Sequence, residues 1–73
     1  MGRAGKALKQ VLQDYGISQY QLAATMGVDR SSISRWVSGE RDPLAEAVYE
    51  IREALKQLNP EAAESFIQLY LFE

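Results

Sequence analysis

The segment from Ser18 to Glu40 restricts the fold of this chain more than any other stretch of it. Two short helix-forming runs meet there at a turn made by Met26, Gly27 and Val28. Ser18 and Gln21 have the spacing of a capping box, in which each side chain accepts a backbone N–H of the other at a helix start. Gly27 supplies the positive φ that a tight turn requires and that other residues reach only at a cost. The segment therefore predicts two short helices packed directly against each other.

Helical periodicity and helix-ending residues continue on both sides of this segment. A helix is predicted at about 4–15 and ends before Gly16, since glycine suits the left-handed residue that stops a helix. Asp29 is a good N-cap for the second motif helix, which we expect to end near 38. Two further helices are expected from Asp42 and Asn59 as N-caps, each followed by a proline at the first helical position. No run alternates apolar and polar residues as a half-buried strand would.

The sequence thus predicts an all-α fold of five short helices in one compact domain over residues 1–73. The predicted apolar stripes pack these helices together. They comprise Leu8, Val11, Leu12 and Tyr15; Leu22, Val28, Ile33 and Trp36 under the turn; Leu44, Val48, Ile51, Leu55 and Leu58; and Ala62, Phe66, Leu69 and Tyr70. Ala23 is expected at the crossing of the two motif helices, where a larger side chain would push them apart.

Length and composition exclude several classes of protein. A chain of 73 residues buries only about 60% of its unfolded surface, which leaves room for one core and no deep pocket. Cysteine and histidine are absent, so the commonest metal ligands and acid–base groups are missing. We therefore expect no enzyme, no metal and no cofactor. No segment resembles a secretory signal or approaches the ~20 apolar residues of a membrane span, which predicts a cytoplasmic protein without a membrane partner.

The charge is distributed unevenly along the chain. The net charge is -2, yet residues 1–42 hold six basic and four acidic residues, whereas residues 43–73 hold two basic and six acidic ones. The carboxylates of the later helices alternate with bases and solvent-facing positions, as on a solvated helix face. Basic groups therefore concentrate in the first part of the chain, and this distribution bears on the choice of partner and not on the fold.

The second motif helix has two faces of opposite chemistry. At about 100° per residue, Ile33, Trp36 and Val37 fall on one side, which predicts that Trp36 belongs to the core. The other side carries short hydroxyl side chains and a guanidinium: Ser31, Ser34, Arg35 and Ser38, with Arg30 between the faces. Short side chains allow a helix to approach a groove floor closely, and arginine can donate two hydrogen bonds to guanine O6 and N7. Tyr20 is expected to point outward from the first motif helix.

These features together resemble the helix-turn-helix of the Cro and lambda-repressor-like superfamily, the XRE family, over about residues 4–58. The motif itself covers 18–40. The resemblance rests on several positions at the right offsets: Ser18-Gln19, Leu22-Ala23, Gly27, Ile33, Trp36, and Ser38-Gly39-Glu40-Arg41 followed by Pro43. Some relatives place a charged pair where this chain has Leu12 and Val37, so an apolar contact is predicted there instead.

The resemblance implies that the helix at 29–38 enters the major groove of double-stranded DNA. Carried over by position, Arg30, Ser31, Ser34 and Arg35 would face base edges. Gln19 would contact a phosphate, and Ser38 with the chain near Gly39 and Arg41 would hold the next phosphates. Arg41 and Lys6 are expected to add electrostatic attraction. The implied function is a sequence-specific, repressor-like transcriptional regulator of prokaryotic or phage type.

The end of the chain carries more apolar residues than one helix face can bury. They are Phe66, Ile67, Leu69, Tyr70, Leu71 and Phe72. Because an exposed apolar patch usually marks an interface, the helix at about 60–72 is predicted to be a homodimerisation element. The acidic second half and this apolar tail also allow an alternative, a protein-interaction module or antitoxin-like partner that keeps the helix-turn-helix fold.

Overall fold

Five helices follow one another through the chain in this computed structural model, which describes residues 3–72. They are α1 (Arg3–Tyr15), α2 (Gln19–Met26), α3 (Arg30–Ser38), α4 (Ala45–Leu58) and α5 (Pro60–Phe72). No strand occurs within the described part, and the predicted all-α fold is confirmed. The predicted domain of residues 1–73 also includes Met1, Gly2 and Glu73, which lie outside the described residues.

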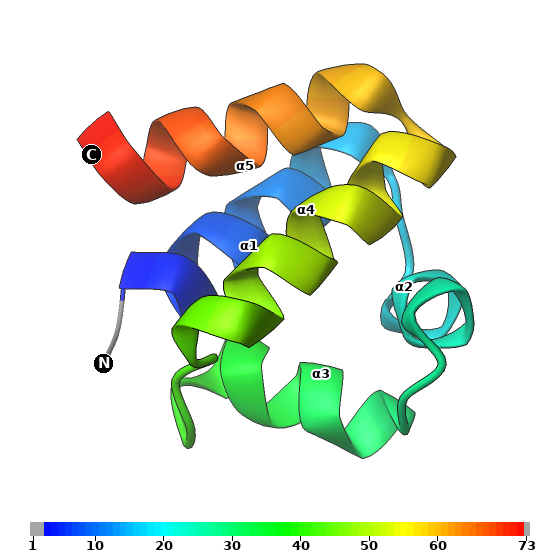
Figure 1. Cartoon of the computed structure of the whole chain (residues 1–73). Coiled ribbons are helices and arrows are strands. Elements are labelled where there is room, and N and C mark those ends of the chain that lie inside the picture. Colours follow the sequence, from blue (N-terminus) through cyan, green and yellow to red (C-terminus); the bar gives the residue numbers. More distant parts are fainter. Residues whose placement is uncertain (1–2, 73) are drawn as a thin grey trace.

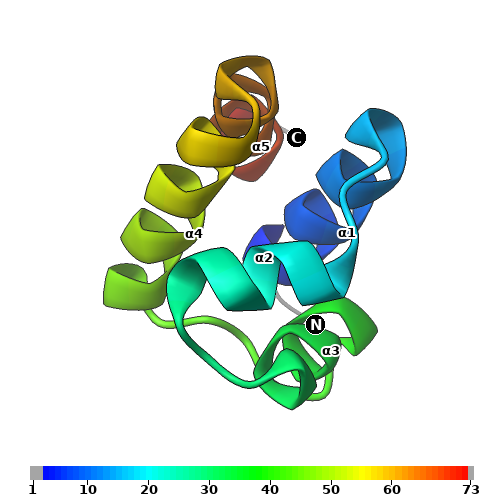
Figure 2. The same ribbon diagram turned by 90° about the vertical axis from the view of Figure 1, so that its right-hand side faces the viewer.

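The helices form two groups that share one core. α5 packs against both α1 and α4, with the C-terminal end of α5 beside the N-terminal end of α1 (Figure 1). α2 and α3 pack against each other at the opposite end of the molecule, where α2 also contacts α4 and α3 contacts α1 (Figure 2). The two-helix motif is therefore carried on a base of three longer helices.

Local sequence signals set most of the helix ends. The capping box at α2 is present, with the Gln21 N–H donating to Ser18 Oγ over 3.0 Å and the Ser18 N–H donating to Gln21 Oε1 over 2.9 Å. Gly16 and Gly27 both have positive φ, 64° and 74°. At α5, the Glu61 N–H donates to Asn59 Oδ1 over 3.0 Å, which confirms Asn59 as the cap before Pro60.

The predicted start of α4 is wrong. The helix begins at Ala45, and its N-cap is Leu44, whose backbone is extended (φ -75°, ψ 167°). Asp42 and Pro43 lie in the connection before it. The φ of about -65° that proline imposes suits an extended connection as well as a first helical turn, so the Asp-Pro pair alone does not fix the boundary.

The core combines residues from all five helices. The largest of its fully buried side chains are Leu8, Val11, Leu22, Ile33, Ile51, Leu55 and Phe66. Burial of one such side chain contributes about 1.5–3 kcal/mol. Two predicted core residues are exposed instead, Leu44 at 78% and Leu58 at 37%, because Leu44 precedes α4 and Leu58 is its last residue. Tyr15 is half-buried, and its hydroxyl hydrogen-bonds Ser65 Oγ over 2.8 Å, which ties α1 to α5.

Candidate nucleic-acid interface

α3 presents an outward polar row and an inward apolar face. Ile33 is fully buried and Trp36 is 9% exposed, so the tryptophan belongs to the core as predicted. Ser31, Ser34 and Arg35 are exposed on the other side of the helix. Arg30 and Ser38 are exposed as well, although the Ser38 hydroxyl donates to the Arg35 carbonyl over 3.1 Å. The polar row therefore contributes little to packing and is available to a ligand.

The turn between α2 and α3 is held by backbone hydrogen bonds. The N–H groups of Gly27 and Val28 both donate to the carbonyl of Ala23, over 2.8 Å and 3.1 Å. Ala23 itself is 3% exposed, which confirms its predicted place among buried residues. Asp29 occupies the N-cap of α3 with extended backbone, but its side chain makes no capping hydrogen bond. The orientation of α3 therefore depends on the turn and the core beneath it.

α1 supports α3 from behind through a close backbone approach. Gly5 is buried, and a Cβ added to it would lie 2.4 Å from the carbonyl oxygen of Trp36. Sequence reasoning missed this role, although a glycine inside an otherwise regular helix is a signal of close packing. Leu12 is buried, Val37 is half-buried against the same core, and both line one small cavity. Direct contact between the two side chains stays a prediction.

The chain folds back on itself at the end of α3. Gly39 has φ 86°, and its N–H donates to the Trp36 carbonyl over 3.3 Å. The Glu40 N–H donates to Ser38 Oγ over 3.3 Å, and the Arg41 N–H donates to the Arg35 carbonyl over 3.2 Å. These three backbone groups were expected near phosphates, but here they serve the fold. Contacts at this end would therefore come from side chains, chiefly the exposed Arg41.

Arg35 has an acidic neighbour that the sequence analysis did not anticipate. Its Nε lies 3.8 Å from Glu40 Oε2, and the two side chains are 48% and 71% exposed. An exposed pair of this kind is worth about 0–1 kcal/mol, so a stronger partner can displace it. The guanidinium therefore remains available for an anion or a base edge.

Gln19 lies beside this surface at the first position of α2. It is half-buried and lines the same small cavity as Val37 of α3. Helix N-termini favour anions, because unpaired N–H groups and the helix dipole point there. Tyr20, the next residue, is 72% exposed, as predicted. The structure thus brings all seven predicted contact residues to α3, to the connection that follows it, or to the adjoining start of α2.

A pair of short helices joined at a glycine turn, with the second helix exposed along a polar face, defines a helix-turn-helix domain. The helix-turn-helix family model matches residues 8–61, which is more than half of the chain. The chain therefore belongs to the helix-turn-helix family of the XRE type, the lambda-repressor and Cro-like family of DNA-binding regulators.

No curated protein and no solved structure matches the chain significantly. The matched range ends at the second residue of α5, so most of that helix lies outside it. None of the helices within residues 3–72 has the length and apolarity needed to cross a membrane.

Proposed function

We propose that this protein binds specific sequences of double-stranded DNA through α3 and acts as a repressor-like transcriptional regulator. The observation that carries the proposal is the exposed row of hydroxyls and guanidinium on α3, backed by buried Ile33 and Trp36, in a chain of the XRE family. A helix held in this way can enter the major groove without losing core contacts.

The residues divide between reading bases and holding the backbone. Arg35 and Arg30 donate to guanine O6 and N7, while the hydroxyls of Ser31 and Ser34 contact neighbouring base edges at short range. Gln19 and Arg41 contact phosphates on either side of the groove and fix the register of α3. Ser38 joins them by turning its hydroxyl from the Arg35 carbonyl to a phosphate. Repression then follows from occupancy, because a domain seated in the groove excludes other proteins from the same DNA.

A homodimer formed through α5 is part of this proposal. Leu71 and Phe72, at the end of α5, are 53% and 79% exposed. A second copy that covers them on a two-fold axis would place two recognition helices about 34 Å apart, one helical turn of DNA. The operator would then be a pseudo-palindrome. Sedimentation that shows a monomer at high micromolar concentration would contradict the dimer.

The alternative function is a protein-interaction module or antitoxin-like protein, which uses the same apolar end of α5 and the acidic outer face of α4. Glu46, Glu50 and Glu53 lie on that helix. This alternative would gain support from binding to a purified partner together with no binding to any duplex at low salt.

Selection of bound duplexes from a random DNA pool tests the main proposal. We expect an enriched motif with two related half-sites, because each α3 reads one half-site. A pool that remains unenriched, under conditions in which the protein is folded, would contradict sequence-specific binding.

A further inference from the structure

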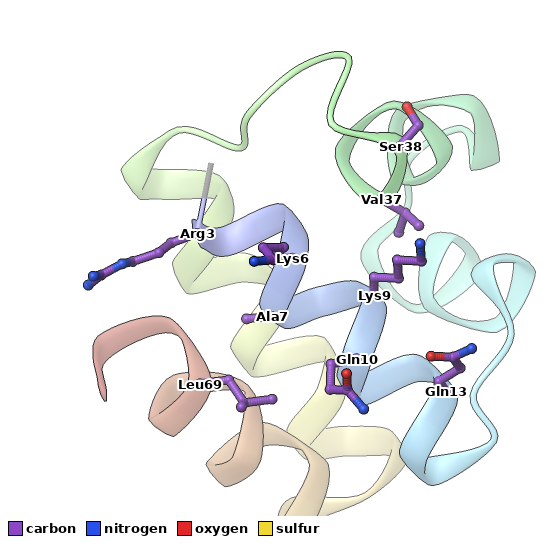
Figure 3. Close-up of a pocket in the computed structure, with 9 residues that line it drawn as sticks. All are labelled: Arg3, Lys6, Ala7, Lys9, Gln10, Gln13, Val37, Ser38 and Leu69. Atoms are coloured by element: carbon purple, nitrogen blue, oxygen red, sulfur yellow. The ribbon is translucent and has the colours of Figure 1, made fainter. Parts of the chain in front are cut away.

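A groove runs along the outer side of α1, beside the end of α3. One cavity of about 700 Å³ lies between α1, α3 and α5, with Arg3, Lys6 and Lys9 on α1, Ser38 on α3 and Leu69 on α5 (Figure 3). A smaller cavity of about 330 Å³ shares Lys9, Gln13 and Val37 with it and extends to Gln19. The two cavities therefore form one depression, here called the α1 groove, between Arg3 and the start of α2.

The α1 groove is basic although the chain as a whole carries a net charge of -2. Its larger cavity is lined by three cations, and none of the described residues that line it is acidic. Asp14 is the one acidic residue of α1, and it accepts a hydrogen bond from the Gln10 amide over 2.9 Å without lining the groove. The groove therefore attracts anions locally.

The arrangement of the charges distinguishes between two kinds of anion. Arg3, Lys6 and Lys9 follow one another at intervals of three residues along α1, and Figure 3 shows Arg3 and Lys9 extending in different directions. Their charges are therefore spread along the helix and do not converge on one point. Arginine, lysine, glutamine and serine are among the side chains that contact nucleic-acid phosphates. The lining therefore fits a polyanion better than a small organic anion.

The position of the groove points to the same ligand. Ser38 lines the larger cavity and Gln19 lines the smaller one, and both belong to the DNA surface proposed above. Lys9 lines both cavities and extends from α1 toward Val37 of α3 (Figure 3). A DNA strand that contacts Gln19 or Ser38 therefore passes the mouth of the α1 groove.

We propose that the α1 groove binds the phosphate backbone of DNA next to the stretch read by α3, through Lys9, Lys6 and Arg3. The inference rests on the proposed DNA binding and extends its footprint. Arg3 to Gln13 spans about 15 Å of helix, and one strand carries a charge every 3.4 Å or so of duplex axis, so about four phosphates fall within reach. Such contacts add affinity without sequence information.

The test uses Lys6→Gln and Lys9→Gln, with Lys56→Gln on α4 as the charge-matched control. Lys56 is exposed and lines neither cavity. Binding to a mixed-sequence duplex of about 30 base pairs is measured from about 50 to 200 mM salt. Each groove variant should lower the magnitude of the slope of log K against log salt by about 1, so that its affinity falls about fourfold less than that of the wild type over this range. The control should keep the wild-type slope. Discrimination between sequences should stay unchanged, because phosphate contacts weaken all sequences alike.

The outcomes are separable. In one outcome the wild type binds the duplex, and the salt slopes of Lys9→Gln, Lys6→Gln and Lys56→Gln are equal. That result would overturn phosphate binding by the α1 groove while leaving α3 as the DNA reader. Absence of duplex binding by the wild type at low salt would overturn both proposals. The third outcome comes from an NMR titration with inorganic phosphate in the absence of DNA. If the amide chemical shifts of Lys6 and Lys9 reach saturation at low millimolar phosphate, the groove binds a free anion, and the inference is overturned as well.

Discussion

The outward face of α3 and the last turn of α5 are both exposed, but their chemistry is opposite. α3 presents serine hydroxyls and arginines, whereas α5 ends in Leu71 and Phe72, 53% and 79% exposed. α3 lies inside the range that matches the helix-turn-helix family, and α5 lies almost wholly beyond it. The exposed residues of one region suit a polar, anionic ligand, and those of the other suit an apolar protein surface.

Both helices separate the residues that stabilise the fold from the residues that are exposed to a ligand. On α3 the packing is done by Ile33 and Trp36, so the outward residues can be chosen for a ligand alone. On α5 the packing is done by Ala62, Ala63 and Phe66, and Leu69 and Tyr70 are partly buried against the same core. The exposed Leu71 and Phe72 contribute little to that packing. Each of the two helices therefore holds one part that stabilises the fold and one part that is free to bind.

The largest expected effect is a difference in stability between substitutions in the buried part of α5 and at its exposed end. Phe66→Ala should lower the free energy of unfolding by about 3–5 kcal/mol, because the ring is fully buried and stacks on Tyr70 with centroids 6.3 Å apart. Phe72→Ala, the matched control, should change it by less than about 0.5 kcal/mol. Urea unfolding measures both, and similar losses for the two variants would show that the end of α5 is part of the core.

The next effect concerns how α1 supports α3. Gly5→Ala should destabilise the fold by about 1–3 kcal/mol, because its Cβ would meet the Trp36 carbonyl, and this cost exceeds the gain of up to about 1 kcal/mol from helix propensity. Gln10→Ala, at an exposed position of the same helix, is the control. A rise in melting temperature for Gly5→Ala would contradict the close approach.

Removal of one guanidinium tests the polar face of α3 directly. Arg35→Ala should weaken binding to the selected operator by about 1–3 kcal/mol and relax the preference at one base pair, with unfolding unchanged. Arg52→Ala on α4 removes an equal charge away from the interface. Unchanged affinity and selectivity for Arg35→Ala would show that α3 does not read bases as proposed.

The apolar end of α5 is tested through assembly. The double substitution Leu71→Ser and Phe72→Ser should raise the dimer dissociation constant at least tenfold, about 1.4 kcal/mol, because both exposed apolar side chains would lie in the dimer interface. Tyr20→Ser, at an exposed aromatic residue of α2, should leave it unchanged. Sedimentation equilibrium measures the constants, and equal values for the three proteins would exclude this dimer surface.

The smallest expected effect comes from Glu40. Glu40→Gln removes the carboxylate 3.8 Å from Arg35 Nε and should strengthen DNA binding about two- to fivefold, within the range of an exposed ion pair. The gain should shrink as salt rises, since exposed charges are screened. Glu53→Gln on α4 is the control. Weaker binding by Glu40→Gln would show that this carboxylate positions the guanidinium for DNA.

Local patterns were sufficient to predict most of the fold. The two faces of α3, the capping box at Ser18 and the glycine turn at Gly27 all depend on residues within four positions of each other, and the structure confirms them. The start of α4 was predicted wrongly because the conformation of Pro43 fits both a helix start and an extended connection. Leu44 and Leu58 were then assigned to a core stripe that does not reach them.

Other features of the structure could not be predicted, because they depend on contacts between residues whose relative positions only the folded chain determines. The approach of Gly5 to the Trp36 carbonyl joins two helices far apart in the chain. The α1 groove needs α3 and α5 beside α1 before its basic residues face a common cavity. The backbone N–H groups after α3 were expected to be available for phosphates, and only the folded connection shows that Ser38 and the α3 carbonyls occupy them.

The most direct measurement of the central claim is an amide chemical-shift map of the protein with its selected duplex at low ionic strength. We predict that the largest changes fall on α3, at Ser31, Ser34, Arg35 and Ser38. The end of α5 should show only the changes that dimer formation causes in a dilution series of the protein without DNA. Changes confined to α4 and α5, or no change at any amide, would contradict this prediction.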